Sequence, residues 1–189
     1  MRSGSSIATI TFLLAGLLFT QCVWASSWQV DAKTSRIGFI ATYDAIEFEG
    51  FFRDFTADIH FNPRSPEEGL FEVNIGLVSV DTDSPDRDEG MLEAEWFDAG
   101  QYPHASFISS TVEQLAGEKE FAVTGNLTIK GITRPVTVSF TWTETGPSAR
   151  LKGQASVNRG EFNIGSGEWA EDDTIGFEVE IVVDLTLTP

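Results

Sequence analysis

The sequence predicts an all-β protein, an antiparallel barrel or sandwich with one short helical insert. Apolar and polar residues alternate along most of the chain, and clusters of Gly, Pro, Asn and Asp separate these runs at short intervals. One aspartate-rich segment interrupts the alternation. Fifteen Phe and five Trp supply apolar surface for a core, which argues against disorder. We therefore expect one folded β domain.

Residues 1–25 are predicted to be a secretory signal peptide and residues 26–189 the folded domain. Arg2 gives the N-terminal region a positive charge, residues 7–19 form an apolar run, and Ala25 is a small residue at the expected cleavage position. The run is shorter than the roughly 20 residues that a membrane-spanning helix needs, so no transmembrane segment is expected in the mature chain. Cys22, the single cysteine, is removed with the signal peptide. Disulfides and thiol chemistry are therefore not expected.

The chain is strongly acidic, with 29 acidic and 12 basic side chains and a formal net charge of −17. An excess of carboxylates repels the phosphates of nucleic acids and the headgroups of anionic lipids. We therefore expect neither nucleic acid nor an anionic membrane surface as a partner.

Period-two alternation predicts eight or nine strands. In the last of them, the apolar residues share one face and Val182 is the only apolar residue on the other. Gly131 is expected to join two strands, and Pro135 to open the second of them. Several runs are about twice the usual length of five or six residues, which predicts a barrel on the order of 30 Å tall. The predicted strands are 28–32, 35–43, 51–62, 69–80, 105–115, 121–130, 136–143, 149–157 and 177–188.

A short helix is predicted over residues 86–96, across one end of the barrel. Ser84 suits the N-cap and Pro85 the first helical position. Leu92 and Trp96 are then expected to share one helical face. Gly90 weakens the helix by about 1 kcal/mol relative to Ala.

The sequence offers little catalytic chemistry. His60 and His104 are the only histidines, and we interpret both as exposed or structural. No G-x-S-x-G motif is present, so a hydrolase triad is not expected. Aspartates 81–88 fail the calcium-loop pattern and are better explained by helix capping. The acidic run at 168–173 leaves a glycosidase-like carboxylate pair as a minor alternative to a solvated loop.

Several short motifs occur in order along the mature chain: Arg87-Asp88-Glu89, Trp96-Phe97-Asp98, Tyr102-Pro103, residues 127–137, Val157-Asn158-Arg159 and Glu161-Phe162. Through these motifs the sequence resembles the YceI-like family over nearly the whole mature chain. The resemblance implies an elongated eight-stranded lipocalin-like barrel, located in the periplasm, that holds a polyisoprenoid such as a quinone tail. It implies no catalytic activity. Family members commonly carry His where this chain has Gly90, and Trp96 replaces the first residue of their Phe-Phe pair.

These observations predict a carrier that sequesters a long isoprenoid lipid as a monomer or homodimer, with no cofactor or metal and no enzymatic activity. An apolar lining is sufficient to bind the tail, because each buried methylene contributes about 0.8 kcal/mol to the binding free energy. The alternative is a solid-cored acidic barrel that docks on a periplasmic protein. A flexible lid is expected at Met91, Leu92 and Phe97, and the expected wall residues are Phe39, Phe107, Leu127, Ile129, Val136, Val138, Phe140, Trp142, Phe177, Val179 and Ile181.

Overall fold

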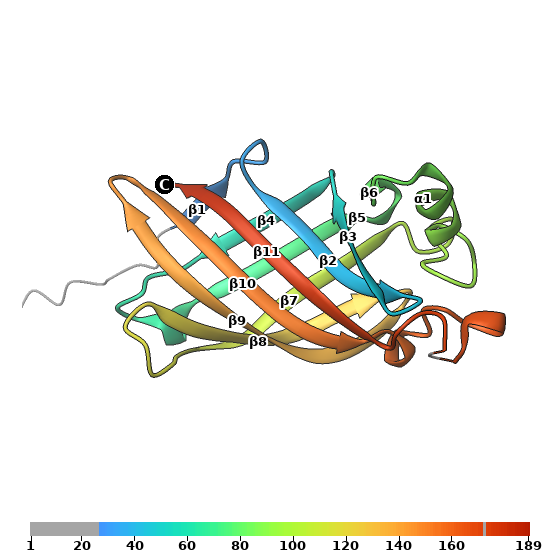
Figure 1. Cartoon of the computed structure of the whole chain (residues 1–189). Coiled ribbons are helices and arrows are strands. Elements are labelled where there is room, and N and C mark those ends of the chain that lie inside the picture. The colour runs from blue at the N-terminus through green and yellow to red at the C-terminus, as the bar shows by residue number, and fades with distance from the viewer. Residues whose placement is uncertain (1–26, 172) are drawn as a thin grey trace, which may run out of the picture.

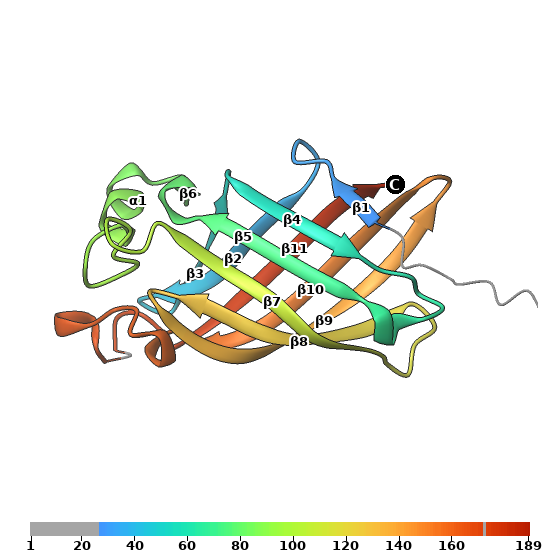
Figure 2. The same ribbon diagram turned by 180° about the vertical axis from the view of Figure 1, so that it is seen from behind.

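The computed structural model describes residues 27–171 and 173–189, so the predicted signal peptide lies outside the described residues. Strands wind into one elongated barrel, and helix α1 (Pro85–Met91) lies at one end of it (Figures 1 and 2). The strands are β1 (Ser27–Val30), β2 (Arg36–Tyr43), β3 (Ile46–Phe52), β4 (Phe55–His60), β5 (Leu70–Gly76), β6 (Val80–Asp81), β7 (His104–Gln114), β8 (Glu120–Ile129), β9 (Ile132–Thr145), β10 (Ser148–Asn158) and β11 (Glu178–Thr188). Short 3₁₀ helices lie between the strands: η1 (Pro66–Glu68), η2 (Leu77–Ser79), η3 (Arg159–Phe162) and η4 (Gly167–Trp169).

Eight antiparallel strands close the barrel, which confirms the predicted fold class. The ring runs β1-β4-β5-β7-β8-β9-β10-β11 and closes through pairing of β1 with β11. Strand β2 pairs with β11 on the same side as β1 but closer to the α1 end, and β3 and β6 continue from β2. The barrel wall therefore has different strands at its two ends.

Two predicted strands are divided in the structure, and β3 was not predicted as a separate strand. The segment predicted at 51–62 bends at Arg53 and Asp54, whose backbone amides donate to the carbonyl and hydroxyl oxygens of Ser79. The segment predicted at 69–80 is interrupted by η2. Strand β3 follows a two-residue turn in which Asp44 and Ala45 both have positive φ. Alanine rarely adopts that conformation, so the turn has no clear sequence signal.

Pro135 lies inside β9 rather than at the start of a strand. The β8–β9 hairpin turns at Lys130 and Gly131, which have φ values of 51° and 71°. Strand β9 therefore begins at Ile132, before the proline. At Pro135, β9 pairs only with β8, because its ladder with β10 begins at Ser139. A proline is tolerated there because the other edge of β9 is locally unpaired.

The predicted helix is shorter than expected. Ser84 and Pro85 occupy the predicted N-cap and first position, but α1 ends at Met91. Beyond it the chain folds back, with the Phe97 amide donating to the Met91 carbonyl. Leu92 and Trp96 therefore do not share a helical face. The weak helix propensity of Gly90 next to the C-terminus is consistent with this early end.

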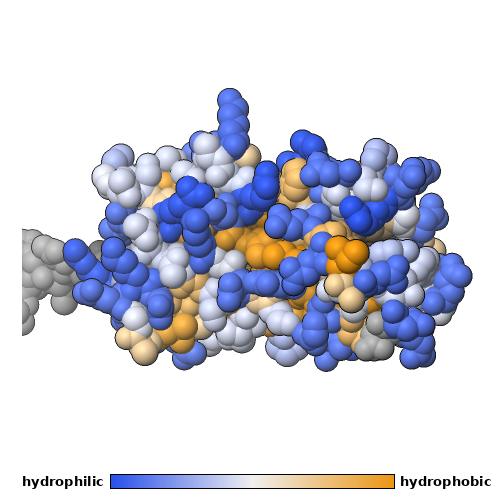
Figure 3. Space-filling view, viewed as in Figure 1, coloured by the Kyte–Doolittle hydropathy of each residue, from blue (hydrophilic) through white to orange (hydrophobic). Residues whose placement is uncertain are grey.

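The outer surface over β2 and β11 is mainly hydrophilic with a small apolar patch near its middle (Figure 3). Val182 lies on this outer face opposite Gly38 in the β2–β11 ladder. A side chain at Gly38 would collide with the Gly50 carbonyl oxygen, 2.3 Å from the position of its Cβ. The absence of a side chain there lets β3 approach β2 closely.

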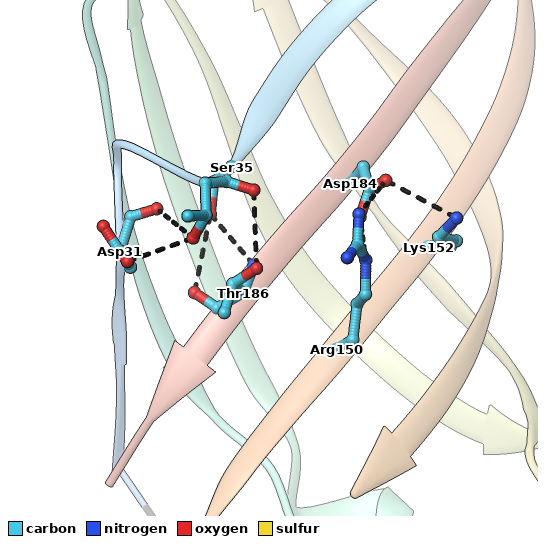
Figure 4. A network of polar contacts seen from close by, with 7 residues as sticks. Asp31, Ser35, Arg150, Lys152, Asp184 and Thr186 are labelled. Atoms are coloured by element: carbon cyan, nitrogen blue, oxygen red, sulfur yellow. Dashed lines mark hydrogen bonds and ion pairs between the residues drawn. The ribbon is translucent and has the colours of Figure 1, made fainter. Parts of the chain in front are cut away.

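An ion pair joins β10 and β11 on the outside of the barrel (Figure 4). Arg150 Nε and Nη2 donate to Asp184 Oδ1 and Oδ2 at 2.6 and 2.7 Å. Lys152 Nζ lies 3.6 Å from Asp184 Oδ2. The hydrogen bonds from Arg150 lower the pKa of Asp184 below its ordinary value of 3.8, against the opposing effect of desolvation.

Asp184→Asn is expected to lower the free energy of unfolding by about 0.5 kcal/mol at neutral pH, because partly exposed pairs contribute little. A carboxyl pKa that is lower in the folded state stabilises the fold above the pKa of the unfolded state. This contribution is lost as pH falls through the folded-state pKa. Urea unfolding at several pH values measures the difference between the two proteins. A difference that persisted well below pH 3.8 would contradict the assignment.

Candidate functional site

Aromatic side chains fill the end of the barrel that lies away from α1. Phe61 is fully buried, and its ring centroid lies 4.9 to 5.6 Å from those of four other rings. Trp28 packs edge-on against Trp142 at 5.1 Å and donates its indole N–H to the Phe61 carbonyl. We call this group the aromatic plug; its members are Trp28, Phe61, Phe71, Phe121, Phe140 and Trp142.

The α1 half of the barrel contains a cavity of about 560 Å³. Strand β11 shows the change along the barrel axis. Its inward residues Leu185 and Leu187 are 1% and 0% exposed. Val179, Ile181 and Val183 also point inward but are only half-buried, and together with Leu185 they line the cavity, whereas Leu187 does not. The cavity is therefore a blind bore that has the aromatic plug as its floor and opens toward α1.

Eleven of the fourteen residues nominated from the sequence line this cavity. They come from β2, β7, β8, β9 and β11 and from the segment around α1, which are far apart in the sequence. Contact with a ligand stays a prediction for each of them. The eleven are Phe39, Met91, Phe97, Phe107, Leu127, Ile129, Val136, Val138, Phe140, Val179 and Ile181.

The other three nominated residues lie away from the cavity wall. Trp142 belongs to the aromatic plug. Leu92 packs beside the core at the α1 end, so only Met91 and Phe97 of the expected lid reach the cavity. Phe177 precedes β11, and its ring packs against the Arg159 guanidinium at 4.9 Å. Alternation shows which face a side chain occupies, but it does not show how far along the bore that residue lies.

Several lining residues were not nominated from the sequence. Val73 and Ile75 of β5 face the cavity, and the alternation of β5 was a usable signal for them. Tyr43 and Phe48 reach it from β2 and β3. Phe48 was missed because β3 was not predicted as a strand, whereas Tyr43 ends the predicted strand 35–43 and was not nominated.

Arg159 holds the loop that follows β10 around the cavity mouth. It is only 3% exposed, and its guanidinium donates to the backbone carbonyls of six residues. These carbonyls belong to Ile164, Gly165, Trp169, Glu171, Ile175 and Gly176. The planar fork of five N–H donors suits such a set of acceptors. Arg159 therefore holds residues 159–171 and 173–176 in their conformation.

Lys130 joins this loop to the segment that follows α1. Its amine donates to the carbonyl oxygens of Ala94 and Asn163 at 2.7 and 2.9 Å. Burial lowers the pKa of Lys130, while Asp98 and Glu95 oppose that shift. The Gly165 amide also donates to the Glu95 carbonyl. The two segments at the open end of the barrel are thus connected to each other.

Arg159→Lys is expected to loosen residues 159–171 and 173–176 and to lower the free energy of unfolding by about 2 kcal/mol, because an ammonium cannot satisfy the same set of carbonyls. Hydrogen exchange of the loop amides, compared with those of β8, measures the local effect. Arg134→Lys, at an exposed position on β9, serves as the control. Equal protection of the loop in Arg159→Lys and wild-type protein would contradict this role.

The rim of the cavity carries a few polar groups, contributed by Tyr43, Ser84, Asp86 and Arg87. Among residues 27–171 and 173–189, no cluster of His, Cys, Asp or Glu could hold a metal ion. None of the helices in these same ranges has the length and apolar character to cross a membrane. The cavity is therefore an apolar chamber with a polar rim.

Comparisons with known proteins agree with the observed fold. A family model described as a YceI-like domain matches residues 28–187. A UPF0312 protein of Pseudomonas fluorescens is 32% identical over 143 residues, which cover 70% of this chain and 69% of that protein. A UPF0312 protein of Pseudomonas savastanoi pv. phaseolicola is 30% identical over 158 residues, 79% of each chain.

Solved structures share the barrel. The crystal structure of Burkholderia cenocepacia BcnA superposes with a TM-score of 0.80 at 32% identity and covers 83% of this chain and 98% of BcnA. A polyisoprenoid binding domain from Saccharophagus degradans superposes with a TM-score of 0.66 at 16% identity, over 85% of this chain and 97% of that domain. The second similarity is one of fold alone.

Proposed function

This chain belongs to the YceI-like family, and from that premise we propose that it is a carrier that encloses the tail of an isoprenoid lipid in its barrel. The observation that carries the proposal is the blind apolar bore in the α1 half of the barrel. The Saccharophagus degradans domain, described as polyisoprenoid-binding, has the same fold. We further propose that the protein is exported and acts in the periplasm as a binding protein rather than as an enzyme.

The volume of the bore sets the length of tail that it encloses. At roughly 30 Å³ for each non-hydrogen atom, the share of a water molecule in the liquid, 560 Å³ accommodates about 19 carbon atoms. That is about four five-carbon units, each contributing roughly 3 to 4 kcal/mol before ordering costs. Longer tails are expected to extend out through the mouth.

The aromatic plug bears on the alternative of a solid-cored docking module. That alternative expects side chains to fill the barrel from end to end, whereas the plug occupies only the half that lies away from α1. A chamber lined by half-buried Val179 and Ile181 favours a ligand inside the barrel.

Organic-solvent extraction of detergent-free protein, followed by mass spectrometry, tests the proposed function. We expect one isoprenoid molecule per chain. Titration of the emptied protein with isoprenoid quinones of one to eight units is expected to show affinity rising to about four units and then levelling off. Absence of stoichiometric isoprenoid in both experiments would contradict the proposal.

A further inference from the structure

The outer surface of β10, β11, β2 and β3, which we call the β2–β11 face, changes its charge along the strands. Four carboxylates point outward toward the α1 end, and four cations point outward toward the opposite end. The acidic half consists of Glu47, Glu49, Glu178 and Glu180, and the basic half of Arg36, Arg53, Arg150 and Lys152. One continuous surface therefore carries opposite charges at its two ends.

The basic half keeps a positive charge although two carboxylates lie within it. Arg53 forms an ion pair with Asp81, and Arg150 and Lys152 form ion pairs with Asp184 (Figure 4). Four cations less two carboxylates leave a formal charge of +2. The side chains of Arg53, Arg150 and Lys152 remain 69%, 51% and 61% exposed. In a chain with a net charge of −17, this half can attract carboxylates.

Apolar side chains lie between the two halves. Val182 is the apolar residue on the outer face of β11, and it pairs with Gly38, which in turn pairs with Phe51 of β3. An apolar patch near the middle of this face is visible in Figure 3. The guanidinium groups of Arg36 and Arg53 lie 4.5 and 5.2 Å from the centroid of the Phe51 ring. These cation–π contacts hold the centre and the adjoining cations in place.

This order of charges is self-complementary about a two-fold axis that lies in the plane of the face and crosses the strands. In an isologous dimer the same surface of two copies meets itself. Along β3, Glu49 and Arg53 stand two residues to either side of Phe51. An axis that passes over Phe51 and Val182 therefore places Glu49 of one copy over Arg53 of the other.

Strand β11 agrees with the same axis. Glu180 of one copy lies over Asp184 of the other, and Asp184 is bound by Arg150 and Lys152, so that this group carries a net positive charge. An axis parallel to the strands would place the two acidic halves on each other, which is unfavourable. The two barrels are therefore antiparallel, and their bores open at opposite ends, away from the contact.

We propose that the β2–β11 face is the contact surface of an isologous homodimer, in which a second copy of this chain binds with its strands antiparallel. Four strands about 4.8 Å apart and five outward positions about 6.6 Å apart give a contact of roughly 500 Å² per copy. A standard interface buries about 800 Å² per partner. We therefore expect a reversible dimer at micromolar concentrations, whether or not the bore holds a ligand.

The net charge of the chain opposes this association at long range. Two copies with a formal charge of −17 each repel one another before they touch. At about 0.15 M salt the Debye length is about 8 Å, so most of this repulsion is screened, whereas the closer charges across the contact are screened less. Dimerisation is therefore measured at that ionic strength.

Two charge-reversed variants test the self-complementary arrangement. Arg53→Glu/Lys152→Glu places glutamates opposite the acidic half, and Glu49→Lys/Glu180→Lys places lysines opposite the basic half. Each variant alone is expected to dimerise at least about tenfold more weakly than wild type, because like charges face one another. An equimolar mixture is expected to form a heterodimer with at least wild-type affinity, because each reversed charge then meets its opposite. Sedimentation velocity between about 1 and 200 μM protein measures these affinities.

Arg64→Glu/Lys119→Glu is the matched control for the first variant. It changes the net charge by the same amount at exposed loop positions outside the β2–β11 face and is expected to dimerise as wild type does. Wild-type protein that stayed monomeric up to about 200 μM would overturn the proposal. A dimer that neither reversed variant weakened would show that another surface holds it. A mixture of folded variants that stayed monomeric would reject the antiparallel arrangement.

Cysteine cross-linking provides a second measurement that needs no change of charge. Val182 lies near the proposed axis, so the two copies of this residue face each other. In a Cys22→Ser background, Val182→Cys is expected to give a disulfide-linked dimer under mild oxidation. Ile108→Cys, at a 54% exposed position of β7 on the opposite side of the ring, is expected to stay monomeric. Equal cross-linking of the two variants would contradict the assigned face.

Discussion

Replacing Ile181 by tryptophan is expected to abolish binding of a four-unit isoprenoid, with an affinity loss of at least about 100-fold. Ile181 projects into the bore from the middle of β11 and is half-buried because the space before it is empty. A larger apolar side chain fills that space without burying a polar group, so the barrel is expected to fold. Each methylene of the tail that no longer fits in the bore is expected to cost about 0.8 kcal/mol of binding free energy.

Val182→Trp provides the matched control for this experiment. Val182 is the next residue of β11, and its side chain points to the outer face opposite Gly38. The same substitution there is expected to leave the affinity within twofold of wild type. Titration calorimetry and circular dichroism of both variants make the comparison. If Ile181→Trp bound the isoprenoid as well as Val182→Trp does, the bore would not be the binding site.

Introducing a charged side chain into the bore tests the same binding site with a more disruptive substitution. Leu127→Asp and Phe140→Asp are both expected to abolish binding, but an unpaired buried carboxylate also destabilises the barrel. Phe140 contributes to the aromatic plug as well as to the cavity wall. Ile181→Trp is therefore the cleaner test of the bore.

Phe61→Ala is expected to lower the free energy of unfolding by about 4 kcal/mol, which is the range for a large aromatic side chain removed from a packed core. Phe61 is 0% exposed and lies at the centre of the aromatic plug. It does not line the cavity, because Phe71 and Phe140 lie between it and the bore. Affinity for the isoprenoid tail is therefore expected to be retained under conditions in which the variant remains folded.

Denaturant unfolding measures the stability loss, and titration of the folded variant measures the affinity. Leu70→Ala, at a position that is 59% exposed, removes apolar atoms from the surface and is expected to cost under about 0.5 kcal/mol. A loss below about 1 kcal/mol in Phe61→Ala would show that the plug is not tightly packed. A division of the barrel into a stabilising half and a binding half predicts that stability and affinity respond to different substitutions.

Alternation along the chain was sufficient to predict an antiparallel barrel or sandwich, because one face of each strand must be apolar to form the interior. The resemblance to the YceI-like family implied the eight-stranded barrel. Val179 and Ile181 were identified as inward-facing on this basis, and both line the cavity. The β2–β3 hairpin was missed because its turn contains Ala45 at positive φ. The early end of α1 was missed because it depends on how the chain folds back after Met91.

The amino-acid sequence by itself determined the all-β class, the inward face of each long strand and the acidic surface, since all three are properties of local pattern and composition. Only the tertiary structure decided that Val138 faces a bore and Trp142 belongs to a plug, although both point inward from β9. The physical reason is that a void depends on the summed volume of side chains that several strands contribute at one level of the barrel. The neighbours of Arg87 and Arg159 likewise come from segments that only folding brings together.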